Sequence, residues 1–275
     1  SAEAASAWRE AGATRVSVGI QSFRDAELQA IDRIHTGEQA ARSLDVLADA
    51  GLSIAADLMI GIPGQSREGL LADAARLAAG PASHVSIYIL ELDKAKRMAD
   101  DRRLRPDLYL SDDAQADAYL EAGRLLSDAG FRHEEVSNWS RPGSEARHNA
   151  KYWRRVPTFG LGVGAHELWN ERRRANTASL GAYLDAIAHG RRPTAADRAI
   201  DDVERAREEI LLGARTREGI PADVLDRWLA ERGDAALRED WEAWIGEGLI
   251  ERRPERYVLT EKGFLVSNEI LYRFV

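Results

Sequence analysis

The chain has 275 residues, of which 44% are hydrophobic and 31% are charged, a balance that permits a buried core and excludes wholesale disorder. Its net charge of −8 argues against a chain whose whole surface binds nucleic acid. No apolar run approaches the ~20 residues of a membrane span, and the N-terminus does not resemble a signal peptide. We therefore expect a cytoplasmic protein.

Cysteine is absent from the sequence, which excludes disulfides, thiolate nucleophiles and cysteine-ligated metals within these residues. The chain begins at Ser1, and its only methionines are Met59 and Met98. We therefore expect it to be a processed or truncated form of a longer protein.

The first ninety residues alternate between strand and helix patterns. Thr36 and Ser66 are suited to cap two of the helices. Strand–helix repeats of this kind predict a parallel sheet with crossover helices, covered on both faces. Strands are expected at 15–20, 53–60 and 84–90, and helices at 25–31, 37–50 and from Ser66 to about Ala79.

The remaining sequence predicts a long helix over 111–129, with Ser111 as its cap and Gly130 as its stop. Residues 91–110 predict a loop or a broken helix, and residues 131–139 one more strand. Little periodicity is visible in 137–178. Helices are expected at 179–189, 201–213, 221–230, 234–246 and 263–273, and strands at 249–253 and 256–260, an order typical of a winged-helix-like unit.

Polar residues stand at or near the ends of the three predicted parallel strands, where such sheets bind ligands. They are Gln21, Asp57 and Glu91. A charged Asp57 within an apolar strand costs free energy unless it is paired or binds something. Backbone N–H groups or an Arg could satisfy this carboxylate, or it could contact a ligand.

Three stretches of the sequence resemble a known family. RVSVGIQSF, RIH and DLMIGIPGQ are similar to the fourth and fifth strands of the radical-SAM barrel in the oxygen-independent coproporphyrinogen III oxidase family. The resemblance implies that Gln21, Arg33 and Asp57 contact S-adenosylmethionine. The residue types suit this role, because carboxylate and amide groups hold hydroxyls and Arg neutralises a carboxylate. For Arg33 alone, the alternative is a solvated charge at a helix end.

A second stretch, RHNAKYW at 147–153, resembles the HNxxYW signature of the family's heme-chaperone (HemW-like) branch. It implies heme contact by His148, Asn149, Tyr152 and Trp153, with His148 as the ligand of the heme iron. The alternative is that His148 and Asn149 hydrogen-bond a loop while the aromatic residues fill the core. In GLGVGAH, His166 is a weaker candidate for the iron ligand.

The region between Arg141 and Arg192 contains ten Lys or Arg and four Asp or Glu, an excess of positive charge in an acidic chain. Such a region suits the two propionates of heme. The alternative is that Arg172, Arg173 and Arg174 form a solvated turn.

The resemblance covers nearly the whole chain and predicts an α/β fold in three parts. These are the second half of a partial (β/α) radical-SAM barrel at 1–136, a linker module with the HNxxYW motif at 137–200, and a winged-helix-like C-terminal domain at 201–275. It implies a heme-binding and heme-trafficking chaperone whose partners are heme and heme-accepting proteins.

The family's cofactors are S-adenosylmethionine and a four-iron (4Fe-4S) iron–sulfur cluster. The CxxxCxxC that binds this cluster belongs to a segment absent from these residues, and ELDKAKR replaces the family's Pro-Gly-Thr after the third strand. We therefore expect the full-length parent to hold the cluster and this chain alone to be non-catalytic.

Two other functions remain open. One is an oxygen-independent coproporphyrinogen III oxidase of porphyrin biosynthesis, against which RHNAKYW argues. The other is a winged-helix DNA-binding protein. Residues 200–275 contain twelve basic and eighteen acidic side chains, which would repel phosphates, so we expect no nucleic-acid partner.

Overall fold

A computed structural model of the chain describes residues 1–90, 96–232 and 235–275. Two compact units are present, Ser1–Glu145 and Ala146–Val275, and each is described by itself. The predicted division into three parts stays a prediction. Glu91, one of the three expected strand-end residues, lies outside the described residues.

The first unit is built on a five-stranded sheet in the order β1-β2-β3-β5-β4. The strands β1 (Arg15–Gln21), β2 (Ser53–Ile60) and β3 (His84–Ile89) are parallel, as predicted. The prediction of a single strand in 131–139 is wrong. Two short strands, β4 (Arg132–Glu135) and β5 (Asn138–Ser140), form an antiparallel hairpin there, which brings the rings of His133 and Trp139 into a stack at 4.2 Å.

The predicted helices and their caps are confirmed in this unit. Thr36 forms a capping box with Gln39, and Ser66 and Ser111 each accept a hydrogen bond from the backbone of the helix that they precede. The broken-helix alternative for 91–110 fits the described part, which holds α5 and a 3-10 helix at Pro106–Leu108. The helices are α1 (Ala2–Glu10), which was not predicted, α2 (Asp25–Ala30), α3 (Gly37–Asp49), α4 (Arg67–Ala79), α5 (Lys96–Leu104) and α6 (Asp112–Asp128).

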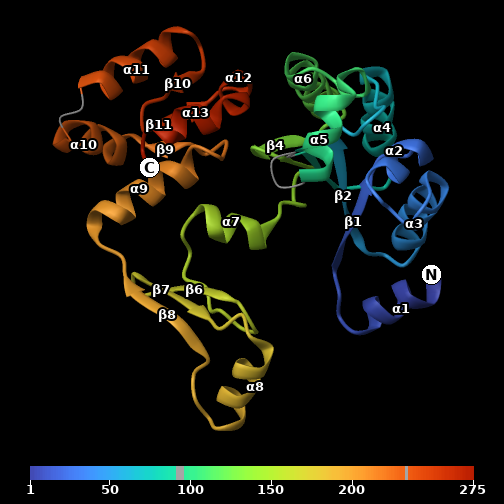
Figure 1. Ribbon diagram of the computed structural model, residues 1–275, viewed down its shortest axis with the longest axis horizontal. Coiled ribbons are helices and arrows are strands. Elements are labelled where there is room, and N and C mark those ends of the chain that lie inside the picture. Colours follow the sequence, from blue (N-terminus) through green and yellow to red (C-terminus); the bar gives the residue numbers. More distant parts are fainter. Residues whose placement is uncertain (91–95, 233–234) are drawn as a thin grey trace. The chain divides into compact units, whose positions relative to one another are not determined.

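One face of this sheet is covered by α3, α4 and α6 (Figure 1). Because side chains alternate along a strand, Ile54, Leu58 and Ile60 of β2 lie on the covered face and are fully buried. The opposite face of β2 carries Asp57. The expectation of two covered faces is therefore met on one side only, within the described residues.

The second unit begins with α7 (Arg147–Trp153), followed by an antiparallel sheet of β6 (His166–Trp169), β7 (Arg172–Asn176) and β8 (Thr194–Ala199). The helices α8 (Leu180–Ala188) and α9 (Asp202–Gly213) confirm two predictions. The elements α7, β6, β7 and β8 were not predicted, since seven or fewer residues show little periodicity.

The end of the chain forms the expected winged-helix-like unit around Trp241, whose ring meets those of Trp244, Tyr257 and Phe274 edge-on. Its sheet has the order β10-β11-β9. The predicted last helix is divided at the β-branched Val266. The elements are β9 (Ile220–Pro221), α10 (Ala222–Arg232), α11 (Ala235–Gly246), β10 (Ile250–Arg252), β11 (Arg256–Leu259), α12 (Glu261–Leu265) and α13 (Ser267–Tyr272).

Across the described ranges, no helix combines the length and the apolar character that crossing a membrane requires.

Candidate functional site

Gln21 lies at the carboxyl end of β1 in an unusual backbone conformation. A β-bulge separates Gly19 from Gln21, and the φ angle of Gln21 is 65°, in the left-handed region that non-glycine residues rarely adopt. Its side chain is buried, and its Oε1 has no hydrogen-bond partner among the described residues. Backbone strain and an unsatisfied buried acceptor are both typical of ligand-binding positions.

The structure brings the side chains of Gln21 and Arg33 to Gly19, and Asp57 lies beside Gly19 on the neighbouring strand. A Cβ atom placed on Gly19 would lie 2.8 Å from Gln21 Nε2 and 3.7 Å from Arg33 Nη2. Gly19 is also the register partner of Asp57 on the neighbouring strand. The missing side chain of Gly19 therefore leaves the space that the Gln21 amide and the Arg33 guanidinium approach, whereas the contacts of the Asp57 carboxylate are with serines of the neighbouring strands.

Asp57 is half-buried and is held by hydroxyl groups from both neighbouring strands. Ser17 Oγ donates to Asp57 Oδ2 at 3.4 Å, and Ser86 is the register partner of Asp57 on β3. Burial raises the pKa of Asp57, and the hydrogen bonds from Ser86 and Ser17 counter part of this rise. Asp57 forms no ion pair with an Arg within the described ranges, although the nearby charge of Arg15 also lowers its pKa.

A buried histidine lies on the same face of the sheet. His84 Nε2 lies 2.9 Å from Asn138 Oδ1, and the Asn138 amide donates to Glu135, which turns the oxygen of Asn138 towards His84. This arrangement assigns the proton to Nε2 and leaves Nδ1 as an acceptor that lacks a partner among the described residues. Burial lowers the pKa of His84.

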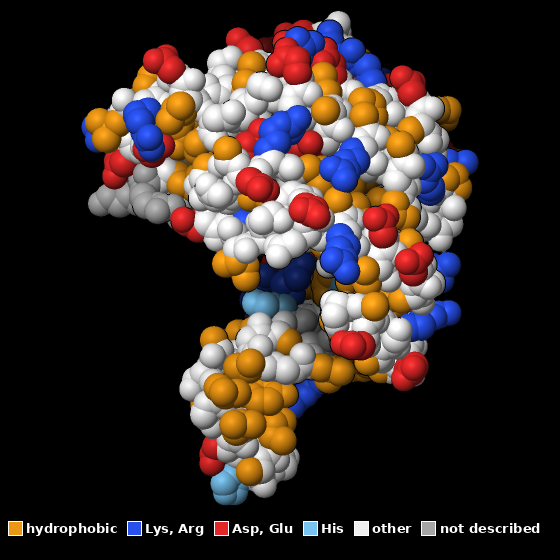
Figure 2. All heavy atoms as spheres, turned by 90° about the vertical axis from the view of Figure 1, so that its right-hand side faces the viewer, with side chains coloured by type: hydrophobic (Ala, Val, Ile, Leu, Met, Phe, Trp, Pro, Cys, Tyr) orange, Lys and Arg blue, Asp and Glu red, His pale blue; other side chains and the backbone are white. Residues whose placement is uncertain are grey.

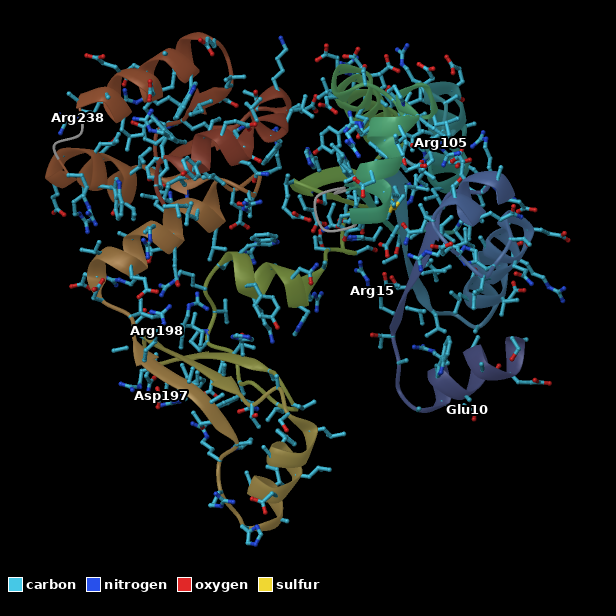
Figure 3. All side chains as sticks on the ribbon, in the orientation of Figure 1. Glu10, Arg15, Arg105, Asp197, Arg198 and Arg238 are labelled. Carbon is cyan, nitrogen blue, oxygen red and sulfur yellow. The ribbon has the colours of Figure 1, made fainter. Side chains whose placement is uncertain are left out.

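Arg15 completes the polar row at the start of β1. Its side chain leaves the strand on the side away from α3 and α4 (Figure 3) and donates to the Ser144 carbonyl oxygen at 2.8 Å. Sequence reasoning did not select Arg15, Ser17, His84 or Ser86 for this site. The available signal was period-two alternation, which places Arg15 and Ser17 on one face of β1 and His84 and Ser86 on one face of β3.

The turn after Gln21 is fixed by Asp73 of α4. The Asp73 carboxylate accepts hydrogen bonds from Ser22 Oγ at 3.1 Å, from the Phe23 backbone N–H at 3.1 Å and from Arg24 Nη1 at 2.8 Å. Because Asp73 is buried, these bonds hold the turn firmly and thereby position Gln21.

In the second unit, α7 exposes part of the HNxxYW motif to solvent. Tyr152 Oη lies 3.1 Å from His148 Nε2, and the two rings meet edge-on with their centroids 5.1 Å apart. His148 and Asn149 are exposed and Tyr152 is 52% exposed, whereas Trp153 is half-buried. The core-filling alternative therefore does not describe Tyr152.

His166, the weaker ligand candidate, is exposed at the start of β6 beside an apolar surface. The rings of Phe159 and Trp169 stack with centroids 4.4 Å apart, and Leu161 and Val163 are exposed between them in sequence. Figure 2 shows further apolar side chains gathered on the lower lobe, which contains α8 and the β6–β8 sheet. The exposed apolar residues of α8 are Leu180, Leu184 and Ile187.

Most arginines of the basic region are engaged by carboxylates of the same unit. The solvated-turn alternative for Arg172–Arg174 is wrong, because these residues form β7 and pair with the carboxylates of Asp197, Glu208 and Glu167. Arg147 and Lys151 of α7 make no ion pair with any described residue. The pairs are Arg155–Glu208, Arg172–Asp197, Arg173–Glu208, Arg174–Glu167, Arg191–Asp185 and Arg192–Glu167.

No group of three or more His, Asp or Glu side chains gathers into a metal-binding cluster within the described parts of the chain. The 275 residues also contain no cysteine, so they do not fit the cysteine-ligated cluster of the radical-SAM family. A metal held by a single exposed imidazole, as heme iron can be, remains compatible with α7.

Comparisons with known proteins decide the family. Residues 1–77 match the model of the Radical SAM superfamily. The chain is 35% identical over 270 residues to the heme chaperone HemW of Mycobacterium tuberculosis. The aligned region covers 96% of this chain and 66% of that protein. The chain belongs to the HemW-like family of radical-SAM proteins.

Other relatives agree with this family. Heme chaperone HemW of Lactococcus lactis is 28% identical over 97% of this chain and 70% of its own length. The chain thus spans about two thirds of the length of these curated relatives.

A solved structure, coproporphyrinogen III oxidase (HemN) from Escherichia coli, matches 100% of this chain and 67% of its own with a TM-score of 0.76 and 18% identity. This likeness confirms the predicted fold class. The first unit is part of an open radical-SAM barrel, and a winged-helix-like region ends the chain.

Proposed function

We propose that the protein is a heme-trafficking chaperone that binds heme on α7 and releases it to heme-accepting proteins. The observation that carries the proposal is the exposed pair of His148 and Tyr152 on the HNxxYW helix. Relatives named heme chaperone align with almost the whole chain and support it.

The chemistry of this pair suits reversible heme binding. An imidazole is a common axial ligand of heme iron, and an aromatic ring offers a surface for the porphyrin. Because His148 lies at the surface, heme can reach it and leave it without opening the core of the unit. Binding through Nε2 requires the Tyr152 hydroxyl to give up its hydrogen bond, whereas binding through Nδ1 does not.

The test is a titration with hemin followed by its Soret absorption. The wild-type chain is compared with His148→Ala and with His189→Ala, a matched control at another exposed histidine of the same unit. We expect His148→Ala to lose the shifted Soret band and His189→Ala to keep it. Equal spectra and affinities for the wild type and His148→Ala would remove His148 as the ligand.

We also propose that Gln21, Arg33 and Asp57 contact S-adenosylmethionine in the full-length protein. The approach of Gln21 and Arg33 to Gly19, and the place of Asp57 beside Gly19 on the next strand, support this proposal. The family's cluster supplies the electron that cleaves S-adenosylmethionine, and these residues provide no thiolate to hold that cluster. We therefore propose no radical step and no oxidase activity for this chain.

Calorimetric titration with S-adenosylmethionine tests this second proposal. We expect weak binding, because three side chains would hold a ligand that the family also binds through the cluster iron. A dissociation constant near 1 μM, about −8 kcal/mol, would contradict this expectation.

A further inference from the structure

Among the described residues, two basic side chains of α7, those of Arg147 and Lys151, lack the carboxylate partners that most arginines of the second unit have. Arg155 and Arg174, for example, reach Glu208 and Glu167 at 2.8 and 2.5 Å. Arg147 and Lys151 are both exposed and have no carboxylate partner in the part of the chain that the structure describes. They are therefore available to an external anion.

Helix geometry places both cations beside the proposed iron ligand. At 3.6 residues per turn, successive residues are separated by about 100° around the helix axis. Arg147, Lys151, His148 and Tyr152 then fall within an arc of about 140°, whereas Asn149 points away from it. The same side of α7 therefore carries an imidazole, a phenol and two positive charges.

The two charges do not stabilise the helix that carries them. Like charges four residues apart repel each other on a helix surface. A cation in the first turn also opposes the helix dipole, and Arg147 is the first residue of α7. No carboxylate of the described residues pairs with either cation to offset this cost, which favours a role in binding an anion.

We propose that Arg147 and Lys151 pair with the two propionate carboxylates of the heme whose iron His148 binds, so that α7 selects porphyrins with free carboxylates. This inference rests on the proposed function and names the groups that recognise the ligand. Arg147 can bind one carboxylate through two parallel hydrogen bonds, and Lys151 can bind the other as a point charge.

The test compares hemin with hemin dimethyl ester, in which both propionates are esterified. We expect the wild type to bind hemin about tenfold or more tightly than the ester. The double variant Arg147→Gln/Lys151→Gln should lose about the same factor for hemin and none for the ester. The double variant Arg172→Gln/Arg191→Gln removes the same charge from arginines that are already paired, and it should bind both ligands as the wild type does.

The outcomes separate this inference from the proposed function. If the wild type binds hemin and its ester equally well, the inference is overturned and heme binding stands; this comparison needs no variant to fold. A loss of affinity that is equal for both ligands in the α7 variant, or equal in the two double variants, would also overturn it. If the wild type binds neither ligand, both proposals are wrong.

Discussion

Arg155 anchors the end of the proposed heme helix, and its removal should loosen α7 measurably. Only 7% of its side chain is exposed. Its Nε donates to Glu208 of α9 at 2.8 Å and its Nη2 to Glu171 at 2.8 Å. Arg155→Gln keeps an amide of similar reach but removes the charge that these carboxylates engage.

The expected loss follows from the exposure of each partner. Glu171 is 54% exposed, so its ion pair contributes at most about 1 kcal/mol. Glu208 is 14% exposed, and a charged hydrogen bond there contributes about 1.5–3 kcal/mol. Because Glu208 keeps Arg173 as a partner, the variant does not leave it as an unpaired buried charge. The total is about 1.5–4 kcal/mol, which is a roughly 10- to 1,000-fold increase in the equilibrium constant for local unfolding of this region.

Hydrogen exchange of the α7 and α9 backbone amides is the appropriate assay, since it reads one region of a chain that has two units. The matched control is Arg172→Gln, which breaks the exposed pair with Asp197 and should cost less than about 1 kcal/mol. If the α7 amides of Arg155→Gln exchange no faster than those of Arg172→Gln, the anchoring role is refuted.

Three further changes test the two sites. Burial raises the pKa of Asp57, so the folded state favours its protonated form and loses that stability as the pH rises through the raised pKa. Asp57→Asn should therefore raise the free energy of urea unfolding at pH 7, with the gain vanishing below about pH 4; destabilisation at pH 7 would contradict this. Tyr152→Phe removes a hydroxyl that competes for His148 Nε2, so hemin should bind up to about tenfold more tightly in a Soret titration, and weaker binding would count against ligation through that atom. Gly19→Ala should displace the Gln21 amide yet change the free energy of unfolding by less than about 1 kcal/mol, because the side chain in the way is flexible; a larger loss in urea unfolding would show a rigid contact.

The sequence predicted the first unit well because its elements carry strong local signals. The strands β1, β2 and β3 are rich in Val, Ile and other apolar residues, and Thr36, Ser66 and Ser111 cap helices as expected. The hairpin of β4 and β5 was mistaken for one strand, because its short turn at 136–137 contains neither Gly nor Pro.

The site residues that are polar within an apolar stretch of sequence could be predicted. Those that reach the site only through the pairing of distant strands could not. Gln21 and Asp57 are polar residues at or within apolar strands. Arg33 was selected as a site residue only because of the family resemblance. The exposed Ser17 and the buried Ser86 and His84 reach Asp57 through strand pairing and register, which a local pattern does not specify. Likewise, the basic region looked available to propionates until strand pairing placed Asp197 and Glu167 beside its arginines.

The central claim is that His148 of α7 is the axial ligand of a bound heme. Electron paramagnetic resonance of the hemin-loaded chain tests it directly, by comparing the wild type with His148→Ala and His166→Ala. We predict the signature of histidine-ligated iron in the wild type and in His166→Ala, and its loss in His148→Ala. Retention of that signature in His148→Ala, with loss in His166→Ala, would contradict the claim and assign the iron to His166 at the start of β6.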